Sequence, residues 1–273
     1  MLRVVLDDTL EDSGTTDVDV QLLADHEPDT CLARGDRVAS AFFDGEFAWV
    51  ALDSFVYLDG TVGAGAFSAS FTFTAQGERS HADLLAAAGV APAVAELAAR
   101  AYGAARDQGL TDSDVYSVID FSRPSTERRL WIVNLATGAL VKNDRVSHGS
   151  GSNSASDPAM ASSFSNTPGS NQSSLGLSRF AETYQGSHGY SLRIDGLEDS
   201  NDNMRSRAIV MHGASYAEDA FVADNGYLGR SNGCPAVAQS RSASTIDVVK
   251  EGTLLFSYFP DDDWLTSSTF LQE

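Results

Sequence analysis

Residues 115–146 read VYSVIDFSRPSTERRLWIVNLATGALVKNDRV, and this stretch carries the strongest fold signal in the chain. A turn around Pro124 and a tight turn at 136–138 divide it into three runs rich in β-branched, aromatic and aliphatic residues. The runs lie at 115–121, 130–135 and 139–146. Short apolar runs bounded by turn residues are typical of consecutive strands. The stretch therefore predicts a β-meander.

Two helices are expected immediately before the meander, over residues 80–109. Ser80 is placed to cap a short helix that Gly89 would end. Pro92 suits the first turn of a second helix, because proline is tolerated there. Apolar residues then recur at helical spacing as far as Gly109.

The part of the chain before these helices, residues 1–76, is acidic and has strand-like patches. Apolar and polar residues alternate over 67–73, which favours a half-buried strand. We expect 1–76 to be a small β-like extension of unknown role. The main domain would then span 77–273, with its core at 115–259.

After the meander, residues 147–176 are rich in Ser, Gly and Asn but hold scattered apolar residues. They predict an ordered surface loop, which is either a lid over a cleft or a purely structural loop. A second loop is expected over 212–234. The remaining elements are strands at 182–184, 190–194, 208–211 and 253–259, and a short helix at 245–249. The predicted fold class is mainly β with α+β accessories.

Composition excludes several classes of function. The chain has 273 residues, a formal net charge of -20 and a pI of about 4.4. No basic stripe is present to neutralise phosphates, so nucleic acid and anionic membrane surfaces are excluded as partners. No segment reaches the length of apolar sequence that a membrane helix needs. The apolar run at the N-terminus is too short for a signal peptide.

The candidate chemistry lies in AIVMHGASY (208–216) and GRSNGCPAV (229–237). His212 ends an apolar run and is expected at a strand end, and Cys234 lies in a turn. A thiol needs a base to become a thiolate at neutral pH, and imidazole is the usual one. Gly233 would allow close backbone approach, and the amides of Gly233 and Cys234 could hold an oxyanion.

Each of these residues also has a simpler interpretation. A single cysteine in a turn is usually inert, and a single histidine at a strand end is usually a capping or surface residue. A disulfide between Cys31 and Cys234 stays open as an alternative. The order of the two motifs, His-Gly and then Ser-x-Gly-Cys, favours a Cys–His site.

With these motifs in place, the chain resembles the L,D-transpeptidase catalytic domain superfamily (YkuD-like), and within it the murein L,D-transpeptidase catalytic domain branch. The resemblance covers about 115–259. It is carried by VIDFSRPSTERRLWIVNL (118–135), VSHGSGSN (146–153), FSNTPGSNQSSLG (164–176), TYQGSHGYSLRIDGLE (183–198), RSRAIVMHGASY (205–216) and GRSNGCPAV (229–237).

The resemblance implies a β-sandwich or barrel catalytic domain and a two-step reaction. Cys234 would attack the carbonyl of meso-diaminopimelate in a peptidoglycan tetrapeptide stem, and D-Ala would leave. A side-chain amine of another stem would resolve the thioester and form a 3–3 cross-link. His212 would be the general acid and base, oriented by the carbonyl of Gly213, and amides near Gly233 would hold the oxyanion.

Further residues in the matching segments are expected to bind substrate: Ser231, Asn232, Arg230, His148, His188 and Tyr216. For His148 and His188 the alternative is loop capping or packing. Many family members have Arg two positions after the cysteine, where this chain has Ala236. Arg230, Arg179 or Arg193 are possible substitutes.

The resemblance also implies a cell-wall location, periplasmic or extracellular, and peptidoglycan peptide stems as partners. We expect a monomer without a cofactor or metal, since the spacing of the His and Cys residues does not fit a zinc site. Two alternatives remain: a carboxypeptidase or endopeptidase that uses water as acceptor, and a non-catalytic module that binds the cell wall.

Overall fold

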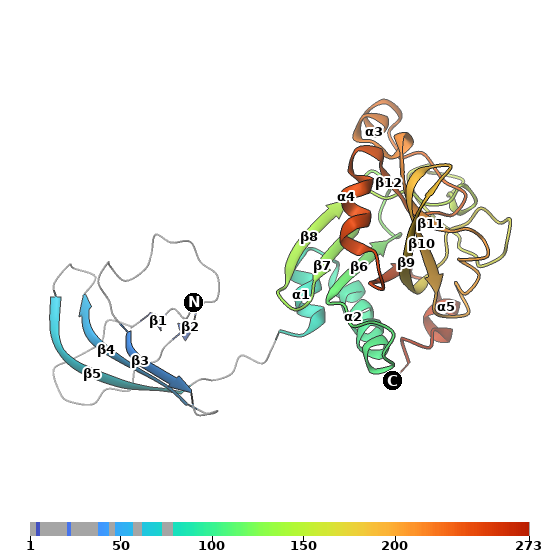
Figure 1. Ribbon diagram of the computed structural model, residues 1–273. Coiled ribbons are helices and arrows are strands. Elements are labelled where there is room, and N and C mark those ends of the chain that lie inside the picture. Colours follow the sequence, from blue (N-terminus) through green and yellow to red (C-terminus); the bar gives the residue numbers. More distant parts are fainter. Residues whose placement is uncertain are drawn as a thin grey trace. The chain divides into compact units, whose positions relative to one another are not determined.

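The structure is a computed structural model that describes residues 79–272 and, before them, the strand residues 4–5, 21–22, 38–43, 47–56 and 62–72. The chain divides into two compact units, Met1–Glu78 and Arg79–Glu273 (Figure 1). Among the described residues, no helix combines the length and the apolar character that crossing a membrane requires.

The first unit contains two small antiparallel sheets. β1 (Val4–Val5) pairs with β2 (Gln21–Leu22). The other sheet has the order β3-β4-β5, formed by β3 (Val38–Phe43), β4 (Phe47–Val56) and β5 (Val62–Thr72). The strand predicted from the alternating residues at 67–73 falls within β5 as far as Thr72. Cys31 lies outside the described residues.

The second unit opens with the two helices that the sequence predicts. α1 (His81–Ala87) begins with a capping box, in which the Ser80 side chain accepts from the amide of Asp83 and the Asp83 side chain accepts from that of Ser80. α2 (Pro92–Asp107) has its proline in the first turn, where no amide hydrogen is needed.

One eight-stranded sheet forms the body of this unit, in the order β12-β11-β10-β9-β13-β6-β7-β8. Its strands are β6 (Val115–Asp120), β7 (Leu130–Asn134), β8 (Ala139–Asp144), β9 (Gly176–Gly186), β10 (Gly189–Gly196), β11 (Val210–Ala214), β12 (Ala236–Ala238) and β13 (Leu254–Tyr258). β13 is parallel to β6, β12 is parallel to β11, and the other pairs are antiparallel. The predicted meander is confirmed as β6-β7-β8.

The sheet curls around α4 (Gln239–Val249), which lies between its two halves (Figure 1). Lys142 of β8 donates to Ser244 of this helix at 3.0 Å. Tyr190 of β10 donates to Asp247 of the same helix at 2.9 Å. Because β8 and β10 belong to opposite halves of the sheet, these contacts show that the helix bridges both. The fold is therefore mainly β, a nearly closed, barrel-like sheet with a few helices, as the sequence predicts.

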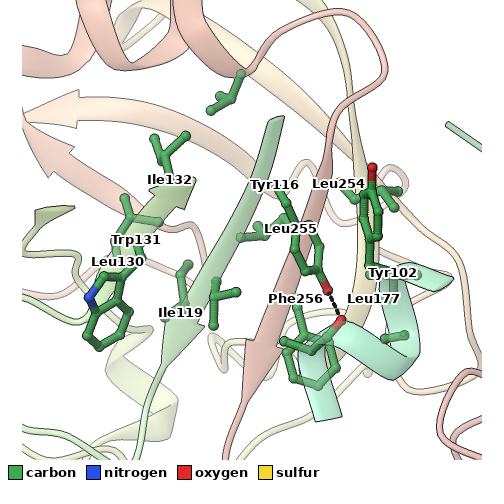
Figure 2. Close-up of a cluster of buried hydrophobic side chains, with 14 of the residues drawn as sticks. Tyr102, Tyr116, Ile119, Leu130, Trp131, Ile132, Leu177, Leu254, Leu255 and Phe256 are labelled. Carbon is green, nitrogen blue, oxygen red and sulfur yellow. Dashed lines mark hydrogen bonds between the residues drawn. The ribbon is translucent and has the colours of Figure 1, made fainter. Parts of the chain in front are cut away.

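The core lies where the last strand enters the centre of the sheet. β13 pairs with β6 on one side and β9 on the other, so Leu254 lies beside Tyr116. Figure 2 shows Tyr116, Leu255 and Phe256 in one cluster with Tyr102 of α2. The exposed fractions of these four side chains are 2% or less. Each such large apolar side chain contributes about 1.5–3 kcal/mol through burial. The packing of these β13 side chains with Tyr102 therefore holds α2 against the sheet.

The region expected as a loop at 212–234 contains further elements. β11 continues to Ala214, so His212 is the third of its five residues rather than a strand end. The loop also holds two short helices, a 3-10 turn at Ser215–Ala217 and α3 (Asp219–Asn225). The chain closes with α5 (Asp262–Ser267), which Asp261 caps.

Candidate active site

His212 occupies the middle of β11 and is held by strands on both sides. Its backbone lies opposite Ser191 of β10 and Ala236 of β12, and only 1% of the residue is exposed. Nδ1 lies 3.0 Å from the carbonyl oxygen of Gly213. A carbonyl can only accept, so Nδ1 carries the hydrogen and Nε2 is left unprotonated in the neutral ring.

The protonation state of His212 follows from its surroundings. Burial lowers its pKa, the Gly213 carbonyl raises it, and the nearby His188 lowers it. The net direction is below the usual value, so the ring is neutral at pH 7. A neutral imidazole with Nε2 free is the form that can accept a proton from a thiol.

Cys234 is a free, half-buried cysteine in the turn that precedes β12. Its Sγ accepts a hydrogen bond from the amide of Val210 at 3.5 Å and lies 3.8 Å from the carbonyl oxygen of Ala208, to which the thiol donates. Burial raises the pKa of the thiol, whereas the Val210 amide and the charge of Arg207 lower it. The net direction is upward, so the group is a thiol at pH 7 and needs a base.

The sheet register brings this thiol to the strand that carries His212. His212 pairs with Ala236 in the parallel β11–β12 ladder. Two residues earlier in sequence are Val210, the first residue of β11, and Cys234, which precedes β12. The contact between the Val210 amide and Sγ agrees with that register. Val210 and His212 are therefore about 7 Å apart along β11, because a strand rises about 3.3 Å per residue. Among the described residues no hydrogen bond joins Sγ to the ring of His212; the thiol donates to Ala208 instead.

Internal hydrogen bonds hold the turn that carries Cys234. The Ser231 hydroxyl donates to the carbonyl of Cys234 at 2.6 Å and accepts from the amide of Gly233 at 3.1 Å. Gly233 has φ of +115°, and a Cβ there would lie 2.7 Å from the carbonyl oxygen of Gln172. Only glycine fits this position.

This turn corrects one expectation about the oxyanion site. The amide of Gly233 is already bonded to Ser231, so it is not available to a ligand. The amide of Cys234 has no hydrogen bond to another described residue. Of the two amides that the sequence suggested, only that of Cys234 is left to donate to an oxyanion.

His148 lies behind the turn, not on a cleft surface as the sequence suggested. It is fully buried, and its carbonyl accepts from the amide of Ser231 at 3.2 Å. Nη2 of the fully buried Arg129 lies 2.9 Å from Nδ1 of His148. Arginine can only donate, so Nδ1 is the acceptor and the hydrogen is on Nε2.

Arg129 holds the segment 146–148, which contacts the Cys234 turn through the carbonyl of His148. Its guanidinium donates to the carbonyls of Val146 and Arg123 as well as to His148. Burial and the charge of Arg129 lower the pKa of His148 to about 3. Its Nε2 has no hydrogen bond to a described residue. His148 therefore stays neutral and is part of the support of the turn.

The remaining predicted substrate-binding residues surround the turn. His188, at the β9–β10 connection, stacks on the ring of His212 with centroids 4.2 Å apart and planes at 19°. Tyr216 packs against Gly229, and burial, with the charge of Cys234, raises its pKa to about 12. Arg230 donates to Asn153 at 2.5 Å and lies over the ring of Tyr227. Asn232 is exposed on the turn itself.

A cation that the sequence did not single out, Arg207, lies next to Gly233 in the turn that carries Cys234. Arg207 donates to the carbonyls of Ser165 and Gln172 and to the hydroxyl of Ser174, all in the Ser-rich loop. Its charge lowers the pKa of Cys234. The suggested substitutes Arg179 and Arg193 lie on β9 and β10, where Arg193 pairs with Glu182. Arg207 immediately precedes the AIVMHGASY motif, which is the one sequence signal that marks it.

The fold and the site together define a class of protein: a β-domain with an imidazole on one strand, β11, and a thiol in the turn that leads into the neighbouring strand, β12. Residues 86–258 match the family model of the L,D-transpeptidase catalytic domain. The match covers well over half of the chain, which therefore belongs to the L,D-transpeptidase catalytic domain family.

Among the described residues, no three His, Cys, Asp or Glu side chains are grouped to hold a metal ion.

Several solved structures that are similar to this chain are L,D-transpeptidases. An L,D-transpeptidase from Mycobacterium smegmatis is 12% identical, with a TM-score of 0.34, and the match covers 95% of this chain and 100% of that one. L,D-transpeptidase 1 of Mycobacterium tuberculosis is 11% identical, with a TM-score of 0.30, covering 78% of this chain and 71% of that one. A search of curated proteins gave no match. Family membership rests on the match at residues 86–258.

Proposed function

We propose that this chain is a cysteine L,D-transpeptidase that acts on peptidoglycan stem tetrapeptides through a thioester on Cys234. The observation that carries the proposal is the position of Sγ at the Val210 amide, two residues before His212 on β11. The neutral ring of His212, held by the carbonyl of Gly213, supports its role as the base.

In the first step the sulfur of Cys234 attacks the carbonyl carbon of meso-diaminopimelate, and Nε2 of His212 takes the thiol proton. The thiol must first turn from the carbonyl of Ala208 toward the ring. The amide of Cys234 donates to the developing oxyanion. The bond to the nitrogen of D-Ala then breaks, and His212 returns the proton to that leaving amine.

In the second step the side-chain amine of another stem attacks the thioester carbonyl. His212 accepts a proton from that amine, the carbon–sulfur bond breaks, and Cys234 leaves as a thiol after taking the proton back. The product is a 3–3 cross-link. Water in place of the amine would give hydrolysis, so the acceptor decides between transpeptidase and peptidase activity. A cell-wall location, outside the cytoplasm, belongs to the same proposal.

Intact-protein mass spectrometry tests this directly. Purified protein is incubated with a tetrapeptide stem, with or without a second stem as acceptor. We expect an adduct equal to the stem without its D-Ala, located on Cys234 and absent from Cys234→Ala. Cys31→Ser is the matched control and should still form the adduct. An adduct retained by Cys234→Ala would refute the proposal, and binding without any adduct would favour a non-catalytic cell-wall module.

A further inference from the structure

A separate cavity of about 490 Å³ lies outside the candidate active site. It is formed by the α1–α2 connection, the β6–β7 connection and residues of β7 and β8. Nine residues line it: Ala88, Gly89, Arg123, Thr126, Glu127, Arg128, Trp131, Asn143 and Arg145. None of them belongs to the Cys234 turn or to β11. Only two residues lie between Arg145 and His148, so at most about 11 Å of chain connects the cavity to the support of the turn.

The charge of the cavity is opposite to that of the protein. Three arginines and one glutamate line it, although the chain as a whole carries a formal charge of -20. Two of the arginines are already paired: Arg123 with Glu127 at 2.6 Å and Arg145 with Asp219 at 2.7 Å. The third, Arg128, donates one hydrogen bond to the carbonyl of Asn143 and forms no ion pair with a described residue. The cavity therefore has one uncompensated positive charge.

Trp131 adds an unused donor to the same cavity. The residue is only 3% exposed, but its indole nitrogen has no hydrogen bond to a described residue and stays open to solvent. Figure 2 shows this nitrogen pointing away from the other side chains of the core cluster. An acceptor of a ligand can therefore reach this N–H in place of water. The guanidinium of Arg123 lies over the indole ring, 5.3 Å from the ring centroid, and covers one of its faces.

Gly89 lies beside this indole nitrogen. Its φ is +97°, and a Cβ at that position would lie 3.5 Å from Nε1 of Trp131. A side chain there would cover the donor. The turn between α1 and α2 thus needs glycine for its backbone conformation, and the same glycine keeps the nitrogen accessible.

We propose that this cavity binds a single peptide carboxylate, held by Arg128 and the indole N–H of Trp131. A guanidinium and an N–H donor that line the same cavity match the oxygens of a carboxylate, and one uncompensated charge matches a monoanion better than a phosphate dianion. The choice of a stem peptide as its source rests on the proposed function. The carboxylate site itself does not, because it is built from residues that take no part in the thioester chemistry.

The indole N–H resonance of Trp131 in ¹H–¹⁵N NMR spectra provides the test. The full chain carrying Cys234→Ala is titrated with an N-acetylated tetrapeptide that has free carboxylates, with the same peptide fully amidated, and with inorganic phosphate. Trp131→Phe assigns the resonance. The thiol is absent, so failure of the thioester reaction cannot affect this result.

We expect a saturable shift of the Trp131 resonance with the free carboxylates and none with the amidated peptide. Arg128→Ala should weaken the binding about tenfold, because a charge-assisted hydrogen bond is lost. Arg106→Ala, which removes the same charge from an exposed site outside the cavity, should leave it unchanged. An equal response to the amidated peptide, a stronger response to phosphate, no shift at all, or unchanged binding by Arg128→Ala would overturn the proposal.

Discussion

His212 and His148 are two buried imidazoles with opposite tautomers. Nδ1 of His212 donates to the carbonyl of Gly213, whereas Nδ1 of His148 accepts from the guanidinium of Arg129. Burial lowers the pKa of both. One ring is left with a free acceptor on the strand whose Val210 amide contacts the thiol of Cys234, and the other ring is left with a donor on the far side of the turn. The partner at Nδ1, rather than the residue type, separates a candidate base from a support.

The largest expected difference between the two histidines is catalytic. His212→Gln removes the free Nε2 acceptor and should lower kcat/KM for thioester formation by about 10²–10⁴-fold. The matched substitution His148→Gln leaves the thiol and its base in place and should lower it less than about tenfold. Rates of adduct formation measured by mass spectrometry on both variants decide this. An equal loss of kcat/KM in the two variants would contradict the different roles assigned to the two histidines.

The second prediction concerns the residue that fixes the tautomer of His148. Arg129→Met leaves the carbonyls of Val146 and Arg123 and Nδ1 of His148 without donors inside the protein. The free energy of unfolding should fall by about 3–5 kcal/mol. Urea unfolding measures it, with Arg106→Met as the control at an exposed position. A loss as small as that of the control would show that the buried network carries little stability.

A third prediction concerns acid sensitivity. The pKa of His148 is about 3 in the folded protein, below its usual value near 6.5. The unfolded chain therefore binds one more proton between these values, and stability falls as the pH drops from 6.5 toward 3. The slope should be at most about 1.4 kcal/mol per pH unit. The difference in unfolding free energy between the wild type and His148→Gln, followed from pH 7.5 to 5, isolates this slope. A constant difference would contradict the low pKa.

The smallest expected effect comes from Ser231, whose amide donates to the carbonyl of His148 and whose hydroxyl donates to the carbonyl of Cys234. Ser231→Ala removes the bond to the carbonyl of Cys234 and the acceptor for the amide of Gly233. We expect a loss of about 1–2 kcal/mol in stability and slower thioester formation. Ser156→Ala changes an exposed serine of the Ser-rich loop and serves as the control. An unchanged rate would show that the turn does not depend on this hydroxyl.

Local signals predicted most of the fold. The turn residues around Pro124 and at 136–138 gave the meander, and Ser80 and Pro92 gave the starts of two helices. β12 was missed because three residues, Ala236–Ala238, show no periodicity. It forms only because β11 lies beside it.

The candidate site was less accessible to sequence reasoning. The contact of Cys234 with Val210, two residues before His212, follows from a strand register that only the folded sheet defines. His148 lies in a His-Gly pair within a segment that resembles the family, so either a cleft position or packing was open; it is buried against Arg129, which lies 19 residues away in sequence. Arg207 acts through contacts with a distant loop that no local pattern reveals.

The coupling between Cys234 and His212 is tested most directly by the pH dependence of alkylation by iodoacetamide, in a Cys31→Ser background. The account predicts that His212→Gln slows the reaction most near neutral pH, where the ring is neutral and the thiol is protonated. The difference should vanish at high pH, where the thiol ionises without a base, and His148→Gln should follow the parent protein throughout. Identical profiles for His212→Gln and the parent would contradict the account.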